Sequence, residues 1–199
     1  EAIATFEDDI LPIETAAFAP LPDRDENGRL LLLGLDGGGY YGGYFSGVNA
    51  LTEEEAQQFG YHSNEMEMLY ISVPDLGATF DSKHVLAHEF SHLLYNEVHG
   101  LFGPDWSWHN EGLAECAVHL VYGENAESFY YTSAPELADG QSLIIWQYAN
   151  YAQYIQAYVF LTYVASRLGG VSGFAEMYAL SGDPDEFDAF LNAELGAGM

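Results

Sequence analysis

Hydrophobic residues follow different patterns in the two parts of this chain. Before residue 75, short apolar runs bounded by glycine, proline and acidic residues predict strands at 30–35, 44–48 and 67–73. After it, apolar residues mostly recur every three or four positions, which is typical of helices. Strands that precede helices indicate an α+β domain in which the two kinds of element are segregated.

Five of the later segments carry the helical spacing and have capping residues or glycines near their ends. Asp81 and Thr79 are N-cap candidates for the first, and Gly123 follows the second. Earlier in the chain, Thr52 and Glu55 have the spacing of a capping box, so a short helix is expected there too. The predicted later helices are 81–96, 110–122, 151–168, 174–180 and 185–194.

The first 29 residues differ in composition from the rest. They are acidic and contain three prolines, so we expect residues 1–29 to be an extended lead-in with little regular structure. Residues 30–199 are predicted to form one domain, with the sheet and one helix in 30–100 and a helical part in 101–199. No apolar run reaches the length of a membrane span. The chain starts at Glu1 without a signal-like segment, which we interpret as a mature or trimmed form.

The charge is strongly one-sided. The chain has 31 acidic and 4 basic residues, a formal net charge of −27. Such a surface repels phosphate backbones and anionic lipid, which excludes nucleic acid and inner-leaflet membranes as partners. Two explanations of the acidity stay open: a salty or extracellular habitat, or bound Ca²⁺ that neutralises part of the excess.

Three acidic runs are candidates for such Ca²⁺ sites: Asp8-Asp9, Asp23–Glu26 and Asp183–Glu186. We find no EF-hand loop spacing in them and interpret them as solvated surface. The single Cys116 excludes an intramolecular disulfide and lies in an apolar helical stretch, where we expect a small buried hydrophobe.

The decisive local motif is His88-Glu89-Phe90-Ser91-His92, inside the first predicted later helix. At positions i and i+4, its two imidazoles project from one helix face. Zn²⁺ prefers four tetrahedral nitrogen, oxygen or sulfur ligands, and two such imidazoles suit this geometry. Glu89 follows the first histidine directly, where it can act as general base toward a metal-activated water.

A third ligand is needed to complete a catalytic metal site. The metzincin pattern would place glycine and histidine where this chain has Tyr95 and Val98, so that pattern fails. Glu111 is the alternative. It follows His92 after eighteen residues, within Asn110-Glu111-Gly112-Leu113-Ala114-Glu115 on the next predicted helix.

Together these two segments resemble the zinc signature of gluzincin peptidases, which include the thermolysin-like enzymes and the zinc aminopeptidases. The chain is most similar to the bacterial hyicolysin-type metallopeptidases, over 86–92 and 110–115 and also at 42–45 and 64–68. The resemblance covers roughly residues 30–170 and is specific only in the two metal segments. It implies a zincin-like fold and an exported zinc endopeptidase that acts on peptides or proteins.

The resemblance also implies supporting roles. A carboxylate four residues after the ligand glutamate orients the first histidine in thermolysin-like enzymes, which implies that role for Glu115. In the aminopeptidases a tyrosine that opens a helix stabilises the oxyanion. Tyr154 is chosen for it, although the Lys and Gly of that motif are missing here. Tyr151 and Tyr158 lie on nearly the same face and remain alternatives, as does His109, which we expect in an exposed loop.

Two other features are interpreted without a firm function. His84 extends the face that carries His88 and His92, and we expect it behind the ligands or at the surface. The glycine-rich stretch 36–43 lacks the residues of a phosphate-binding loop. It is either a strand and turn that line the substrate cleft or a plain turn.

The metal motif predicts Glu89 as general base, and the resemblance implies a secreted zinc endopeptidase with Tyr154 as oxyanion donor. Two alternatives stay open. If Glu67 bound a substrate α-amine, the enzyme would be an aminopeptidase-like exopeptidase. The other alternative is a non-catalytic zinc-containing binding module. The presence of Glu89 argues against it, because a structural zinc site requires no general base.

Overall fold

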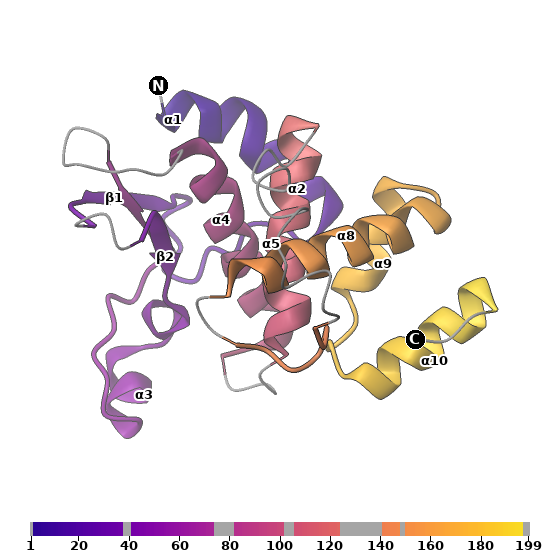
Figure 1. The fold of residues 1–199 in the computed structure, drawn as a ribbon. Coiled ribbons are helices and arrows are strands. Elements are labelled where there is room, and N and C mark those ends of the chain that lie inside the picture. Colours follow the sequence, from indigo (N-terminus) through magenta and orange to yellow (C-terminus); the bar gives the residue numbers. More distant parts are fainter. Residues whose placement is uncertain are drawn as a thin grey trace. The chain divides into compact units, whose positions relative to one another are not determined.

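The computed structural model describes residues 2–37, 41–73, 82–101, 106–123, 141–147 and 150–196. The chain divides into two compact units, Glu1–Leu101 and Phe102–Met199. The described strands belong to the first unit, whereas the described part of the second is helical (Figure 1). The fold is therefore α+β, as the hydrophobic pattern predicts, and it is consistent with a zincin-like metallopeptidase domain.

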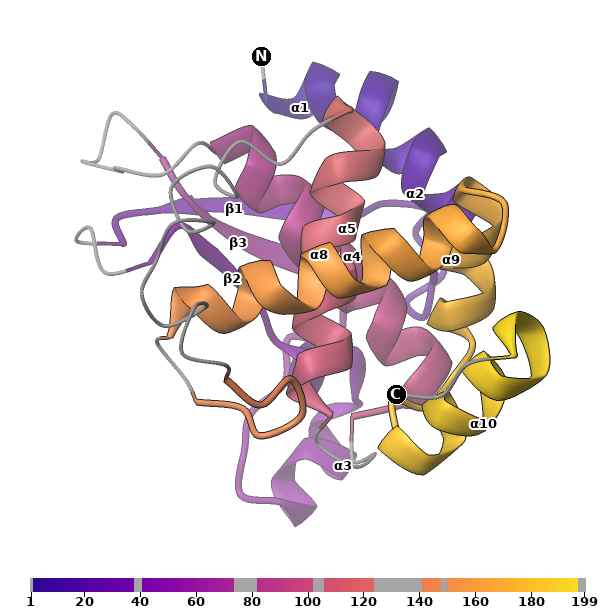
Figure 2. The same ribbon diagram turned by 45° about the vertical axis from the view of Figure 1, so that its right-hand side comes forward.

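The first unit contains a small mixed sheet. Its strands are β1 (Leu31–Leu35), β2 (Gly43–Phe45) and β3 (Met68–Ser72). β3 lies between the other two, parallel to β1 and antiparallel to β2 (Figure 2). Four of the five β3 residues are buried, because this strand has a neighbour on each side and is covered by helices.

β1 differs from the buried strand that its run of leucines suggests. Leu31 and Leu33 are 46% and 42% exposed. β1 pairs with β3 only, within the described residues, so it forms an edge of the sheet and exposes alternate side chains. An apolar run shows that a strand is hydrophobic but does not show which of its faces is covered.

The prediction of an extended lead-in over residues 1–29 is wrong for its first half. α1 (Ala2–Thr5), a π-helical turn (Phe6–Ile10) and α2 (Leu11–Ala17) follow one another without a break. Pro12 lies near the start of α2, directly after the π-helical turn, where a residue without an N–H interrupts the helical hydrogen-bond ladder. Phe6 and Ile10 recur at helical spacing and are buried, and the Phe6 ring meets that of Phe90 edge-on at 5.0 Å.

α4 (Ser82–His99) carries the two candidate histidine ligands and packs on β2 and β3. It extends three residues beyond its predicted end. Gly100 then has a φ of +75°, and its N–H donates to the Asn96 carbonyl at 2.8 Å. The N-cap candidates Asp81 and Thr79 lie outside the described residues.

The predicted capping box is confirmed. Thr52 precedes α3 (Glu53–Gln58), and its side chain accepts the Glu55 N–H while the Glu55 carboxylate accepts the Thr52 N–H. This reciprocal pair satisfies two of the amide groups that a helix start leaves unpaired.

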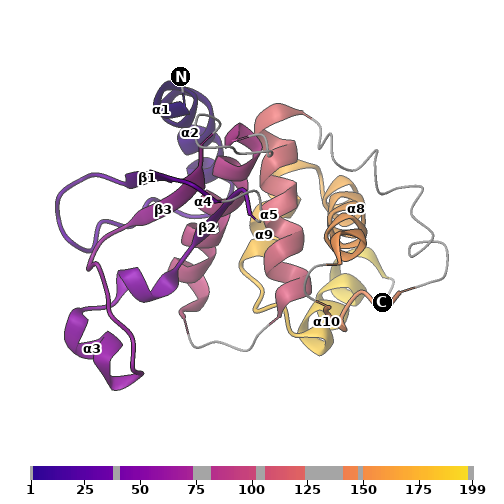
Figure 3. The same cartoon turned by 60° about the vertical axis from the view of Figure 1, so that its left-hand side comes forward.

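The second unit is built from four described helices (Figure 3): α5 (Ser107–Tyr122), α8 (Tyr151–Arg167), α9 (Val171–Tyr178) and α10 (Pro184–Leu195). α5 packs against α8 and α9. A Cβ at Gly112 would lie 2.8 Å from the Ala157 Cβ and 2.8 Å from Leu161 Cδ1, so only glycine permits this approach of α8 to α5.

No helix within the described ranges combines the length and apolarity that a bilayer crossing requires.

Candidate metal centre

His88 and His92 lie one turn apart on α4, as the motif predicts. Their Nε2 atoms are 3.1 Å apart, and both side chains are half-buried. Two nitrogens bound about 2.0–2.1 Å from a tetrahedral metal would be about 3.3–3.4 Å apart. The observed separation is close to this value, so the two imidazole nitrogens are near enough to each other to share one ion.

Glu89 is only 9% exposed, and its carboxylate is held by the sheet. Glu89 Oε2 accepts the backbone N–H of Phe45 at 2.9 Å. Phe45 is the last residue of β2, and Glu89 lies on α4. This hydrogen bond therefore connects the sheet to the helix that carries the metal motif. No local pattern in the sequence indicates this contact.

Glu111 lies on α5 and is half-buried, and the three residues after it, Gly112 to Ala114, are buried. His88, His92 and Glu111 each offer one ligand atom, which makes two imidazole nitrogens and one carboxylate oxygen. A set of two nitrogen ligands and one oxygen ligand suits Zn²⁺. That these three residues bind one and the same ion stays a prediction.

Glu14 is a residue that the sequence analysis missed. It lies on α2, is 0% exposed, and neither of its carboxylate oxygens has a hydrogen-bond partner within the described part of the chain. Burial raises the pKa of Glu14 well above its usual range, and the nearby His88 partly opposes this rise. Treating residues 1–29 as an extended segment concealed it, although Ile10, Glu14 and Ala17 have helical spacing.

Replacement of Glu14 by Met is expected to stabilise the metal-free protein by about 1–3 kcal/mol, since an unpaired buried polar group is removed. A raised folded-state pKa means that stability is lost as pH rises above the unfolded value of 4.5. The gain should therefore be larger at about pH 8 than at about pH 5 in urea unfolding. Glu7→Met, at an exposed position of the same helical segment, is the control. An equal gain in that control, or one independent of pH, would contradict the explanation.

Glu115 lies one turn after Glu111 on the same helix and is half-buried. Its role in orienting His88 stays a prediction. The role of Tyr154 as oxyanion donor also stays a prediction. Its ring lies on α8 beside those of Trp146 and Tyr151, with centroids 4.9 and 5.8 Å away.

Two of the three alternative oxyanion candidates, Tyr158 and His109, are held in other contacts. The Tyr158 hydroxyl lies 2.9 Å from His119 Nδ1. His109 is 0% exposed, and its Nε2 lies 3.0 Å from the Met177 carbonyl oxygen. The expectation of an exposed loop histidine at 109 is wrong, because α5 begins at Ser107 and places this ring in the core of the second unit.

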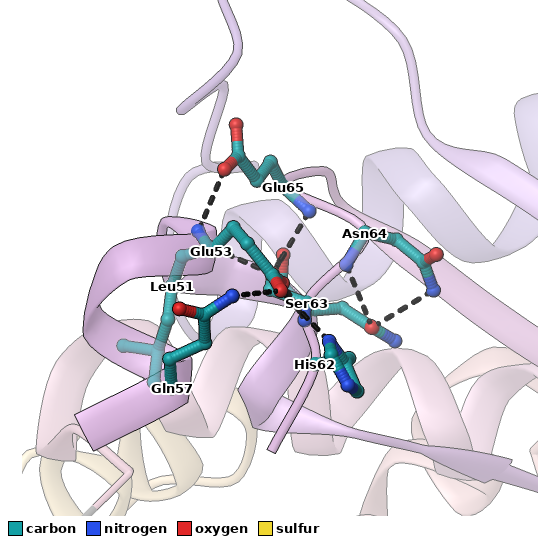
Figure 4. Close-up of polar contacts among 8 residues, drawn as sticks. Leu51, Glu53, Gln57, His62, Ser63, Asn64 and Glu65 are labelled. Atoms are coloured by element: carbon teal, nitrogen blue, oxygen red, sulfur yellow. Dashed lines mark hydrogen bonds and ion pairs between the residues drawn. The ribbon is translucent and has the colours of Figure 1, made fainter. Parts of the chain in front are cut away.

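A polar network surrounds the segment just before β3 (Figure 4). The Glu53 carboxylate accepts the Ser63 N–H and the Gln57 amide, both at 2.8 Å, and lies 2.7 Å from His62 Nδ1. These contacts, the backbone one foremost, lower the pKa of Glu53 to about 2. His62 thus belongs to a surface network around α3.

Glu67 bears on the choice between endo- and exopeptidase. Its side chain is 2% exposed, and its Oε1 accepts the backbone N–H of Arg24 at 2.9 Å. A carboxylate that binds a substrate amine has to be accessible, and this one is enclosed by the chain itself.

The glycine-rich stretch is described only in part, since residues 38–40 lie outside the described ranges. A Cβ at Gly43 would lie 2.6 Å from the Tyr70 carbonyl oxygen and 2.7 Å from Val85 Cγ1. Gly43 therefore lets α4 approach the sheet closely. Cys116 is buried, as expected, and burial raises the pKa of its thiol.

Comparison with known proteins supports a relationship to metallopeptidases. The chain is 26% identical over 186 residues to the neutral metalloprotease ShpI of Staphylococcus hyicus. The match takes in 81% of this chain but only 40% of that relative. No protein-family model matches the sequence.

Proposed function

We propose that this chain is a zinc-dependent endopeptidase of the gluzincin type whose metal is held by His88, His92 and Glu111. The observation that carries the proposal is the imidazole pair on α4 followed directly by a carboxylate, Glu89, that is already fixed in place. Zinc bound there would polarise the scissile carbonyl and lower the pKa of a bound water.

Glu89 is assigned the proton transfers. It accepts a proton from the attacking water and passes it to the leaving amine. The Phe45 N–H limits the rotation of this carboxylate, which holds Glu89 Oε2 in one place before substrate binds. Such prior positioning lowers the entropic cost of reaching the transition state.

Supporting roles are assigned to residues of α5 and α8. Glu115 accepts the second ring N–H of His88, which fixes the imidazole tautomer. Tyr154 donates to the oxyanion of the tetrahedral intermediate. The hydrogen bond between Tyr158 and His119 supports the choice of Tyr154 over Tyr158.

Cleavage inside the chain of a peptide or protein is favoured over removal of N-terminal residues. The burial of Glu67 supports this choice, because that carboxylate is the α-amine binder that the exopeptidase alternative requires. Export from the cell belongs to the same proposal and rests on the resemblance. Because the chain spans 40% of the length of the relative it matches, that relative's activity is brought to this chain only as part of the proposal.

Metal removal tests the proposal directly. Dialysis against 1,10-phenanthroline should lower cleavage of an internally quenched peptide with both termini blocked by at least about 100-fold. Added Zn²⁺ should restore it, and elemental analysis should find stoichiometric zinc in the active protein. A free-amine aminoacyl substrate serves as comparison and should stay uncleaved. Zinc binding without cleavage would favour a binding module, whereas cleavage that survives complete metal removal would refute the proposal.

A further inference from the structure

The loop before β1 has the ligand spacing of the first half of an EF-hand. Asp23, Asp25, Asn27 and Gly28 occupy positions 1, 3, 5 and 6 of such a loop. Gly28 has the left-handed φ of +66° that the sharp turn at position 6 needs. The interpretation of Asp23–Glu26 as plain solvated surface overlooked this. The second half of the motif is missing, since Leu31 at position 9 has no side-chain oxygen and Gly34 replaces the glutamate of position 12.

Glu67 supplies a carboxylate from another part of the chain. Each of Asp23, Asp25 and Glu67 offers one ligand atom, and these atoms lie within 4.8 Å of one another. The Leu31 N–H donates to the Glu67 backbone carbonyl at 2.9 Å, which ties the residue after this loop to the start of β3. The sheet therefore brings Glu67 to the acidic loop.

The Glu67 side chain points to a ligand independently of the loop. It is 2% exposed, and its Oε2 is buried without a hydrogen-bond partner among the residues that the structure describes. Leaving such an oxygen unsatisfied is costly. The guanidinium of Arg24 does not reach Glu67 Oε2. It is directed instead to Glu97 of α4, whose Oε2 accepts from Arg24 Nη2 at 2.7 Å. A cation between the three carboxylates would satisfy it.

We propose that Asp23, Asp25 and Glu67, with the side-chain oxygen of Asn27, bind one Ca²⁺. All of these ligand atoms are oxygens. Such a set does not suit zinc, which prefers nitrogen and sulfur ligands. Ca²⁺ accepts six to eight oxygen ligands in flexible geometry, whereas Mg²⁺ demands a near-ideal octahedron that a loop and a strand end do not impose. The bound ion would fasten the segment before β1 to the central strand of the sheet.

Calcium titration of the zinc-loaded full chain tests this site separately from the catalytic metal. Isothermal calorimetry should show one Ca²⁺ per chain, and saturating Ca²⁺ should raise the Tm by several degrees. Asp25→Asn and Glu67→Gln should each weaken Ca²⁺ affinity by at least about tenfold with zinc content unchanged. Asp8→Asn removes the same charge at an exposed position elsewhere and should leave Ca²⁺ affinity as it is.

Three results would overturn the proposal. One is no heat of Ca²⁺ binding, and another is an equal Tm rise in the variants and the wild type, which would indicate general charge screening. Mg²⁺ binding as tight as that of Ca²⁺ would also contradict it. If Glu67→Gln does not fold, Asp25→Asn still decides the matter, because Asp25 is exposed.

Discussion

The variant Glu89→Gln is expected to lower kcat/KM on the blocked peptide by about 10²–10⁴-fold while zinc content stays unchanged. Glutamine keeps the size of the side chain and can still contact the Phe45 N–H through its amide oxygen. It cannot accept the proton of the attacking water at neutral pH. The change therefore removes the general base and leaves the ligands in place.

Steady-state kinetics and elemental analysis of the same preparation check this result together. Glu176→Gln, at an exposed position on α9, makes the same chemical change far from the motif in sequence and should match the wild type. A Glu89→Gln protein that cleaves peptide at the wild-type rate would refute the assigned base. Loss of zinc from it would show that Glu89 contributes to metal binding.

Glu111→Gln is expected to have the second large effect, on metal affinity itself. Loss of a carboxylate ligand should weaken Zn²⁺ binding by more than about 100-fold, because loss of a group that only supports a ligand already costs about 10–100-fold. Activity at limiting zinc should fall with it. Competition with a chromophoric chelator measures the affinity.

Glu115→Gln provides the graded comparison on the same helix, one turn away. It should weaken zinc binding by about 10–100-fold, less than Glu111→Gln, if it orients His88 as proposed. Equal effects of the two changes would contradict the assignment of Glu111 as the direct ligand. Zinc affinity unchanged in Glu111→Gln would remove the basis for a gluzincin site.

Two buried carboxylates of the first unit, Glu14 and Glu67, stand apart from the acidic surface. Both contain oxygens with no hydrogen-bond partner among the described residues, whereas most of the described acidic residues face solvent. Buried unpaired carboxylates reduce stability unless a proton or a cation compensates them. At Glu14 burial favours the proton, and at Glu67 the neighbouring aspartates favour a cation. The same unfavourable burial thus points to different chemistry at the two positions.

The sequence by itself determined the local features of this protein. The spacing of His88 and His92 placed both imidazoles on one helix face, and Thr52 with Glu55 fixed the start of α3. Helical periodicity located α4, α5 and α8 to within a few residues. All of these depend on residues a few positions apart, whose relative placement the backbone geometry sets once the helix forms.

The tertiary structure alone decided the contacts between distant residues. The Phe45 N–H reaches Glu89 across 44 positions of sequence, and Glu67 meets the loop of Asp23 and Asp25 through strand pairing. Likewise, only packing shows that Glu14 is buried and that Leu31 is exposed. Periodicity specifies which face of an element is apolar, but the path of the chain determines what that face, or a backbone N–H at a strand end, will meet.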